Sequence, residues 1–267
     1  MKRTIPIDSP AGAAVAAHAK PSPGFDQQVI AALATLRAAA AEFPDGIVQA
    51  TSLGAEDMVI TDLIARHELP IAIGMLDTGQ LHDETVALVE RTQRHYGLRI
   101  EIWRPDAAAA RNFVATHGAD AMRQSVELRH ACCALRKLEP LARMLEGRQG
   151  WVTGVRREQS QQRKQASLHE RDLQGRAKWN PLIDWTLGNV WHYIRLHGVP
   201  YNPLHDRHFP SIGCSPCTRA VAIGEDFRAG RWWWENDGVK ECGLHVERLA
   251  RSPEAKEFLQ RNIGEHP

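Results

Sequence analysis

The sequence predicts an α/β fold built on a mainly parallel sheet with helices on both faces. Segments with the apolar spacing of an amphipathic helix alternate along the N-terminal half of the chain with short apolar runs typical of buried strands. Polar turns that contain glycine follow directly after two of these strands. Such alternation is typical of parallel sheets, in which ligands bind beyond the carboxyl ends of the strands.

The first helix is expected from about Asp26, and the first strand is expected over residues 46–52. One apolar face indicates the helix and is formed by Val29, Ile30, Leu33 and Leu36. The strand runs into the turn "SLGAED", residues 52–57. A second helix then follows, indicated by the spacing of Val59, Ile60, Leu63 and Ile64.

Further strands are predicted over residues 71–76, 98–103 and 151–155. The turn "DTGQLH" follows the first of these three. A helix begins at about Asp83, and its apolar face carries Val86, Val89 and Tyr96.

Beyond about Arg163 the periodic pattern weakens, and irregular structure is expected as far as Trp234. One helix interrupts this region, with Thr186 as its N-terminal cap and Gly198 at its end.

The chain of 267 residues is long enough for one large domain with a buried core. No internal repeat or linker divides it, so we expect a single domain over residues 26–245. Residues 1–25 are expected to form a disordered arm, because a signal peptide would need an apolar region that Pro10 and His18 interrupt. Residues 246–267 are expected to form a tail.

The formal net charge of +1 gives no indication of a nucleic-acid or membrane partner, and no apolar run is long enough for a transmembrane helix. Five cysteines are an odd number, and their surroundings are unlike a secreted disulfide framework. We therefore expect a cytoplasmic protein with metal-bound or reactive thiols. The sequence leaves the oligomeric state open and is compatible with a homo-oligomer.

The turn "SLGAED" is a candidate anion site because of its position between a buried strand and a helix. It is not a Walker loop, since no G-K-[ST] ends it. Backbone N–H groups at such a helix start can hold a phosphate or sulfate without a lysine. The alternative is a simple turn in which Glu56 and Asp57 stabilise the helix N-terminus, and both can hold at once.

Four cysteines form two pairs, the adjacent Cys132 and Cys133 and the C-x-x-C of Cys214 and Cys217. Two such pairs can supply four thiolates to one metal centre. Adjacent cysteines on a helix point about 100° apart, which strains a single tetrahedral zinc site but suits the separated iron corners of a cluster. A structural zinc ion, a redox-active C-x-x-C and buried free thiols remain alternatives, and the pairs favour a [4Fe–4S] cluster.

Five cations lie at positions that can face a ligand. Lys137 follows the adjacent cysteines, Arg156 and Arg157 follow the last predicted strand, and Arg228 and Arg231 precede the fifth cysteine. Arginine forks bind sulfate and phosphate oxygens in bidentate fashion. Each cation alone is explained by a surface ion pair or by solvent, but the four arginines together suggest a polyanionic substrate.

The fifth cysteine, Cys242, lies apart from both pairs in a charged stretch with Lys240 and His245. Nearby cations favour the thiolate form that a nucleophile requires. Gly238 and Gly243 suit a mobile segment. A thiol outside a metal site stays free to react, and the alternative is a surface cysteine without a role.

Taken together, the motifs resemble the assimilatory adenylyl-sulfate (APS) reductases, the iron–sulfur branch of the phosphoadenylyl-sulfate (PAPS) reductase family. The likeness spans about Ile47 to His245 and rests on "SLGAED", "LDTGQLH", "CCALRKLEPL", "VTGVRREQS", "IGCSPCTR", "GRWWW" and "KECGLH". Relatives that use PAPS mostly lack both cysteine pairs, so the pairs point to the iron–sulfur branch. The chain departs from the family pattern in its "SLG" and in the tail after His245.

The resemblance implies a Rossmann-like fold of the adenine nucleotide α-hydrolase type, with an irregular cluster-binding region and a mobile C-terminal segment at about residues 235–245. It implies a [4Fe–4S] cluster held by Cys132, Cys133, Cys214 and Cys217. Cys242 would attack the sulfur of APS, giving AMP and an S-sulfocysteine. Thioredoxin or glutaredoxin would then release sulfite, as a step of sulfate assimilation toward cysteine.

The resemblance also implies a set of substrate-binding residues: Ser52, Gly54, Ala55, Glu56, Asp57, Leu76, Asp77, Thr78, Gly79, Lys137, Gly154, Arg156, Arg157, Arg228, Arg231 and His245. Two other functions remain as alternatives. One is a PAPS reductase that carries a cluster, and the other is a non-catalytic regulatory module that binds a cluster and a nucleotide.

Overall fold

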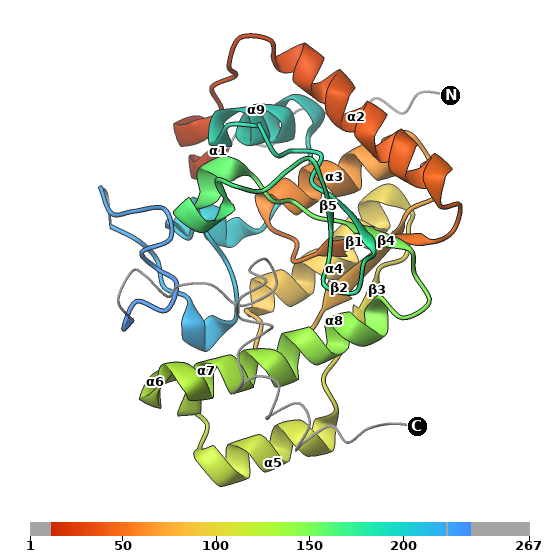
Figure 1. Cartoon of the computed structure of the whole chain (residues 1–267). Coiled ribbons are helices and arrows are strands. Elements are labelled where there is room, and N and C mark those ends of the chain that lie inside the picture. Colours follow the sequence, from red (N-terminus) through yellow and green to blue (C-terminus); the bar gives the residue numbers. More distant parts are fainter. Residues whose placement is uncertain (1–11, 223, 236–267) are drawn as a thin grey trace.

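The computed structural model describes residues 12–222 and 224–235. Cys242, His245 and the tail over residues 246–267 lie outside the described residues, and so does most of the predicted nucleophile segment. Within the described part, the chain folds around one sheet (Figure 1).

The sheet has six strands in the order β3-β2-β1-β4-β6-β5. The strands are β1 (Ile47–Thr51), β2 (Ala72–Leu76), β3 (Glu101–Trp103), β4 (Gly150–Val152), β5 (His169–Arg171) and β6 (Ala177–Trp179). Among the described strands, only the pairing of β5 with β6 is antiparallel. The chain runs outward from β1 to β2 and β3, and then returns to β4 on the other side of β1. This reversal creates the crevice in which ligands bind in open parallel sheets.

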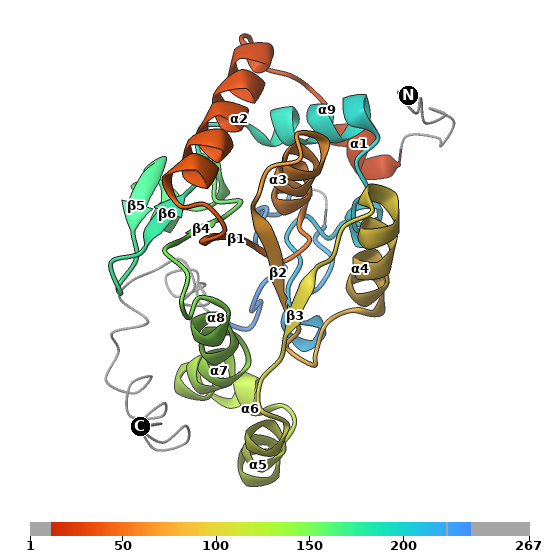
Figure 2. The same cartoon turned by 90° about the vertical axis from the view of Figure 1, so that its right-hand side faces the viewer.

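Helices cover both faces of the sheet, as the sequence predicts. One face carries α2 (Phe25–Glu42), α3 (Ala55–Arg66), α4 (Asp83–Tyr96) and α9 (Leu187–His197), whose apolar residues share a core with Ile47, Ile73 and Val152. The opposite face carries α8 (Glu139–Met144), where Met144 packs with Val48 and Trp151. Figure 2 shows α3 and α4 on one side of β1, β2 and β3, with α7 and α8 on the other.

The adjacent cysteines lie on an almost continuous helical run. After α5 (Ala107–His117) and α6 (Ala121–Gln124), α7 (Val126–Cys133) passes through a π-helical turn, η1 (Ala134–Leu138), into α8. Pro140, in the first turn of α8, cannot donate a backbone hydrogen bond, and the widened turn comes directly before it. Such π-turns are frequent at functional sites.

Two local predictions are wrong. Residues 12–25 are not disordered, because α1 (Ala13–His18) buries Ala14 and Val15 against the core and the Ala14 N–H donates to Asp206 at 2.9 Å. The region after Arg163 is not irregular throughout, since β5 and β6 form a hairpin there. The helix capped by Thr186 is confirmed, because the Thr186 side chain accepts from the Asn189 N–H.

Individual apolar positions also differ from the predicted faces. Ile30 and Val86 are exposed by 67% and 52%, and Phe25 and Leu88 take the buried positions of their helices instead. No helix in the described part of the chain is long and apolar enough to cross a lipid bilayer.

Gly150 lets strands β4 and β6 approach each other closely because it has no side chain. A Cβ there would lie 2.8 Å from the Ala177 carbonyl oxygen and 2.5 Å from the Trp179 ring. We expect Gly150→Ala to lower the free energy of unfolding by about 1–3 kcal/mol, because the β4–β6 contact would have to open. Urea denaturation measures this change.

The matched control is Gly97→Asn. Gly97 ends α4 with φ +67° and has open space around it, and asparagine tolerates that backbone conformation. A loss below about 1 kcal/mol is expected there. Equal losses in the two variants would contradict the packing explanation for Gly150.

Candidate active site

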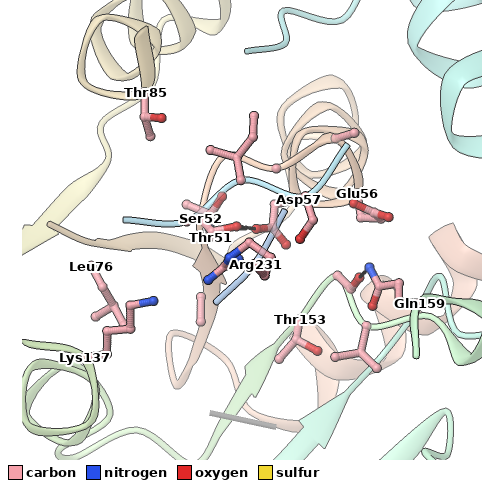
Figure 3. Close-up of a pocket in the computed structure, with 18 of the residues that line it drawn as sticks. Thr51, Ser52, Glu56, Asp57, Leu76, Thr85, Lys137, Thr153, Gln159 and Arg231 are labelled. Carbon is pink, nitrogen blue, oxygen red and sulfur yellow. Dashed lines mark hydrogen bonds between the residues drawn. The ribbon is translucent and has the colours of Figure 1, made fainter. Parts of the chain in front are cut away.

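The carboxyl ends of β1, β2 and β4 open into a cavity of about 190 Å³. Its walls come from the end of β1 and the start of α3, the end of β2, the segment after β4, and the loops over residues 210–214 and 227–232. Figure 3 shows side chains from these elements converging on the cavity. The position matches the crevice that the strand order creates.

The "SLGAED" loop forms one wall and is held by Asp57. One oxygen of the Asp57 carboxylate accepts hydrogen bonds from both the N–H and the hydroxyl of Ser52, each at 2.7 Å (Figure 3). Leu53 adopts φ +57°, a left-handed conformation that turns the chain into α3. The amides of the first turn of α3 have no acceptor within the helix, so this wall can bind an anion.

The two acidic residues of the loop have different environments. Burial raises the pKa of Asp57 to about 6, and the neighbouring Glu56 adds to the rise against the opposing bonds from Ser52. Burial also disfavours the ionised form of Glu56, but Arg156 outweighs it and holds the pKa of Glu56 below its ordinary value. The side-chain contacts of Asp57 thus fold the loop, and Glu56 pairs with a cation.

Arg156 and Arg157 are not among the residues that line the cavity. The Arg156 guanidinium is buried and pairs with Glu56 at 2.9 Å and with Glu158 at 2.7 Å. Arg157 pairs with Asp184 and donates to the Ala166 carbonyl. Both side chains are therefore paired with carboxylates of the chain itself and do not line this cavity, and their contact with a substrate stays a prediction.

The residues of the "DTG" turn also differ in whether they line the cavity. Thr78 lines the cavity, whereas Asp77 accepts from the Gly79 N–H and pairs with Arg104, both at 2.9 Å. Asp77 and Gly79 shape the turn, with Gly79 at φ +68°. The remaining predicted residues that line the cavity are Ser52, Gly54, Ala55, Glu56, Asp57, Leu76, Lys137, Gly154, Arg228 and Arg231.

The cavity also contains residues that the sequence prediction missed. Thr51, Thr85 and Thr153 contribute hydroxyl groups, and Gln159 and Arg163 come from the turns after β4. Arg163 lies three residues after the "VTGVRREQS" motif that carries Arg156 and Arg157, so the motif lies close to the arginine that lines the cavity but does not include it. Short 3₁₀ turns over this segment bring Gln159 and Arg163 to the cavity.

His205 is a further missed residue and is almost fully buried at the cavity wall. Burial lowers the pKa of His205 to about 4, against the opposing charge of Glu56. The imidazole is therefore neutral at physiological pH.

The four paired cysteines line one second, smaller cavity beside the first. All four are buried free thiols, brought together from α7 and from η5 (Ser215–Cys217) with Cys214, which caps η5. Burial raises the pKa of Cys132 to about 12 and that of Cys217 to about 11. Thiols of this kind lose their protons at neutral pH when a metal centre binds the sulfur atoms in place of the protons.

Among the described residues, no three histidine, cysteine or acidic side chains are close enough to form a site for a single metal ion. The four thiols instead surround a cavity, and a cluster holds its thiolates farther apart than one ion does. Arg136 Nε, Arg231 Nε and Trp232 Nε1 are buried without a hydrogen-bond partner among the described residues. N–H groups of this kind suit the sulfur atoms of an anionic cluster, so the residues present fit an iron–sulfur centre.

The two cavities share a wall. Lys137, Cys214, Arg231 and Trp232 line both of them. In Figure 3, Lys137 and Arg231 extend into the larger cavity from different elements. The wall between the thiol-lined cavity and the larger cavity therefore carries two cations, Lys137 and Arg231.

The sequence model of the phosphoadenosine phosphosulfate reductase domain matches residues 46–220. The chain belongs to this reductase family. The match begins just before β1 and extends past the C-x-x-C, so it includes both cavities apart from the segment that carries Arg228 and Arg231.

Curated relatives agree with the family. A protein from Allochromatium vinosum, named adenosine 5′-phosphosulfate reductase, is 54% identical over 82% of this chain and 86% of its own length. A protein of the same name from Burkholderia cepacia is 50% identical over 83% of this chain and 89% of its own length. These matches confirm the family that the motifs predict.

Solved structures agree with the fold. The PAPS reductase from Candida auris, in a phosphate complex, superposes with a TM-score of 0.60 at 28% identity, covering 73% of this chain and 97% of that chain. The FMN adenylyltransferase from Candida glabrata shares the fold alone, with a TM-score of 0.51 at 14% identity over 93% of this chain and 86% of that chain. The predicted α/β fold of the adenine nucleotide α-hydrolase type is confirmed.

Asp57 makes a pH-dependent contribution to stability that can be measured. Its folded pKa of about 6 lies above the ordinary value of 3.8, so the proton binds more tightly to the folded chain. This stabilisation is complete below the ordinary pKa and is lost as the pH rises through about 6. Relative to Asp57→Asn, the unmodified chain should lose about 3 kcal/mol between about pH 4 and pH 7.

Urea denaturation across that pH range measures the difference. The control is Asp45→Asn, because Asp45 is exposed and distant in the fold from the "SLGAED" loop. A pH profile that is the same in Asp57→Asn and in the unmodified chain would show that Asp57 is not desolvated as the structure has it.

Proposed function

We propose that the chain is an adenylyl-sulfate reductase, which converts APS into sulfite and AMP in sulfate assimilation. The observation that carries the proposal is the wall shared by the two cavities. A nucleotide pocket and a set of four thiols meet there at two cations, Lys137 and Arg231. Relatives about half identical in sequence bear the name of this activity.

In the proposed complex the adenosine lies at the end of β2, beside Leu76 and Thr78. The phosphate and sulfate groups lie between the "SLGAED" loop and the cations Lys137, Arg163, Arg228 and Arg231, all of which line the cavity. Arginine and lysine neutralise the anion, and the amides at the start of α3 orient it. This arrangement leaves the sulfate end of the nucleotide beside the shared wall.

We further propose that Cys132, Cys133, Cys214 and Cys217 hold a [4Fe–4S] cluster. When bound, the cluster would supply an electrostatic field that makes the sulfur of the substrate more electrophilic. Lys137 and Arg231 lie between the thiols and the pocket and would balance the negative charge on both sides. A cytoplasmic location suits this assignment, because free thiols persist in reducing compartments.

Cys242 is the proposed nucleophile. Its thiolate attacks the sulfur of APS, a sulfur–sulfur bond forms, and the bond from sulfur to the phosphate oxygen breaks. AMP leaves with that electron pair, and an S-sulfocysteine remains. A thiolate of thioredoxin or glutaredoxin then attacks the Cys242 sulfur and expels sulfite, and a second thiol of the same partner resolves the mixed disulfide and restores Cys242.

A PAPS reductase activity is the second candidate, because the Candida auris structure that superposes on this chain bears that name. PAPS carries an additional 3′-phosphate, which needs its own cationic contact. The cations that line the cavity are all assigned above to the phosphate and sulfate groups, and this favours APS.

Replacing Cys242 tests the nucleophile. Cys242→Ser should lower sulfite formation by about a thousandfold or more, because a hydroxyl does not replace the thiolate in this exchange. Iron and acid-labile sulfide, measured after anaerobic purification, should remain at the level of the unmodified chain. Mass analysis should find an added SO₃ on the Cys242 peptide of the unmodified chain after incubation with APS.

Cys132→Ser is the matched control, since it should lose iron and sulfide instead. An SO₃ adduct on another cysteine, or sulfite formation that survives in Cys242→Ser, would refute the nucleophile. Stoichiometric zinc in place of iron would refute the cluster.

Comparing the two nucleotides tests the substrate. We expect kcat/KM for APS to exceed that for PAPS by more than about tenfold, because a 3′-phosphate without a cationic partner is costly to desolvate. Sulfite release with a saturating thiol reductant measures both values. Equal values would favour the PAPS reductase instead.

A further inference from the structure

A buried ion pair links the cysteine-bearing helix to the end of the described chain. Arg129 lies on α7, three residues before Cys132, and its side chain is fully buried. Its Nε and Nη2 atoms donate to the two carboxylate oxygens of Glu235 at 2.6 and 2.9 Å. The Glu235 side chain is only 5% exposed, so this is a desolvated, bidentate pair.

The pair encloses a strained turn at Trp232. This residue is 1% exposed and has φ +41°, which is rare for a bulky side chain and persists only where its surroundings hold it. The Glu235 N–H closes the turn by donating to the Trp232 carbonyl at 2.9 Å. The Arg129 guanidinium carbon lies 4.7 Å from the centre of the Trp232 ring, so Arg129 holds both ends of the turn.

Arg231 immediately precedes this turn, and its backbone forms a bridge with Thr218 while its side chain contacts the ring at the start of the turn. Its guanidinium carbon lies 4.5 Å from the centre of the same indole ring. The backbone of Gly213 packs against the guanidinium so closely that a Cβ there would lie 2.3 Å from Nη2. The indole ring and the Gly213 backbone therefore orient the Arg231 side chain at the shared wall.

We propose that Arg129 and Glu235 are positioning residues that hold Arg231 between the cysteine cavity and the nucleotide pocket. They do so through the turn at Trp232. The inference rests on the proposed function in taking the phosphate and sulfate end of APS as the group that Arg231 meets. Breaking the pair removes two charge-assisted hydrogen bonds that connect α7 to the end of the turn, so the turn is held less firmly.

Two variants test the pair without substituting Arg231 itself. Glu235→Gln removes the carboxylate, and Arg129→Lys keeps the charge but loses the fork that binds both oxygens. Binding of APS is measured by calorimetry in a Cys242→Ser background, and KM and kcat are measured with Cys242 present. Iron and acid-labile sulfide are measured in the same preparations.

We expect Glu235→Gln to weaken APS binding and raise KM by about tenfold, the loss of one well-aligned charge-assisted contact. Arg129→Lys should have a smaller effect in the same direction, and kcat should change by less than about threefold in both. Iron content should stay at the unmodified level. Such a split between KM and kcat distinguishes a displaced Arg231 from a general loss of fold.

The matched control is Glu101→Gln. Glu101 also binds an arginine in bidentate fashion, with Arg148 Nη2 at 2.9 and 2.8 Å from its two oxygens, but it lies at the start of β3, away from the carboxyl ends of the strands. Its loss should leave the KM for APS unchanged.

Unchanged APS binding in Glu235→Gln, or an equal effect in Glu101→Gln, would overturn the inference. If Glu235→Gln does not fold, Arg129→Lys decides in the same way, and unchanged binding there overturns it. Failure of the proposed function looks different. The chain with Cys242 present would then make no sulfite from APS, whatever the binding measurements show.

Discussion

The cost of burying negative charge is the constraint on which this end of the molecule depends. Four buried thiols line one cavity, and the adjoining cavity has the loop geometry of an anion site. Burial, together with the neighbouring cysteines, raises the pKa values of Cys132 and Cys217, so thiolates form there only with a strong compensating charge. Lys137 and Arg231 supply part of that charge from the wall that the cavities share.

The topology explains why this wall lies where it does. Strands β2 and β4 flank β1 on opposite sides, so the loops that follow them diverge and leave a crevice at the end of β1. The "SLGAED" loop closes one side of the crevice, with Asp57 bonded to Ser52. The helical run over α7, η1 and α8 approaches from the opposite face of the sheet and brings Lys137 to the same place.

Much of this arrangement could be predicted from the sequence, because the signals are local. Apolar periodicity located the first three strands and their helices, and the spacing of the cysteine pairs located the second cavity. The hairpin of β5 and β6 was missed because neither strand lies in an apolar run like those that indicated β3 and β4, and the charged side chains of β5 suit an edge. The pairing of Arg156 with Glu56, about a hundred residues earlier, could not be predicted, because sequence alone does not show contacts between distant segments.

The π-turn η1 lets the two ends of one helical run face different partners, the C-x-x-C loop at α7 and the sheet at α8. In an uninterrupted α-helix each residue advances about 100°, so the orientation of Cys132 and Cys133 would be fixed by the face that α8 buries against the sheet. The wider turn η1 lies between the cysteines and α8 and changes the rotation of one relative to the other. The thiols therefore contact the C-x-x-C loop while Met144 packs against Val48. The length of this stretch therefore matters as well as its residue types: removing one residue from residues 134–138 would rotate the cysteines by about 100° relative to the face that α8 buries.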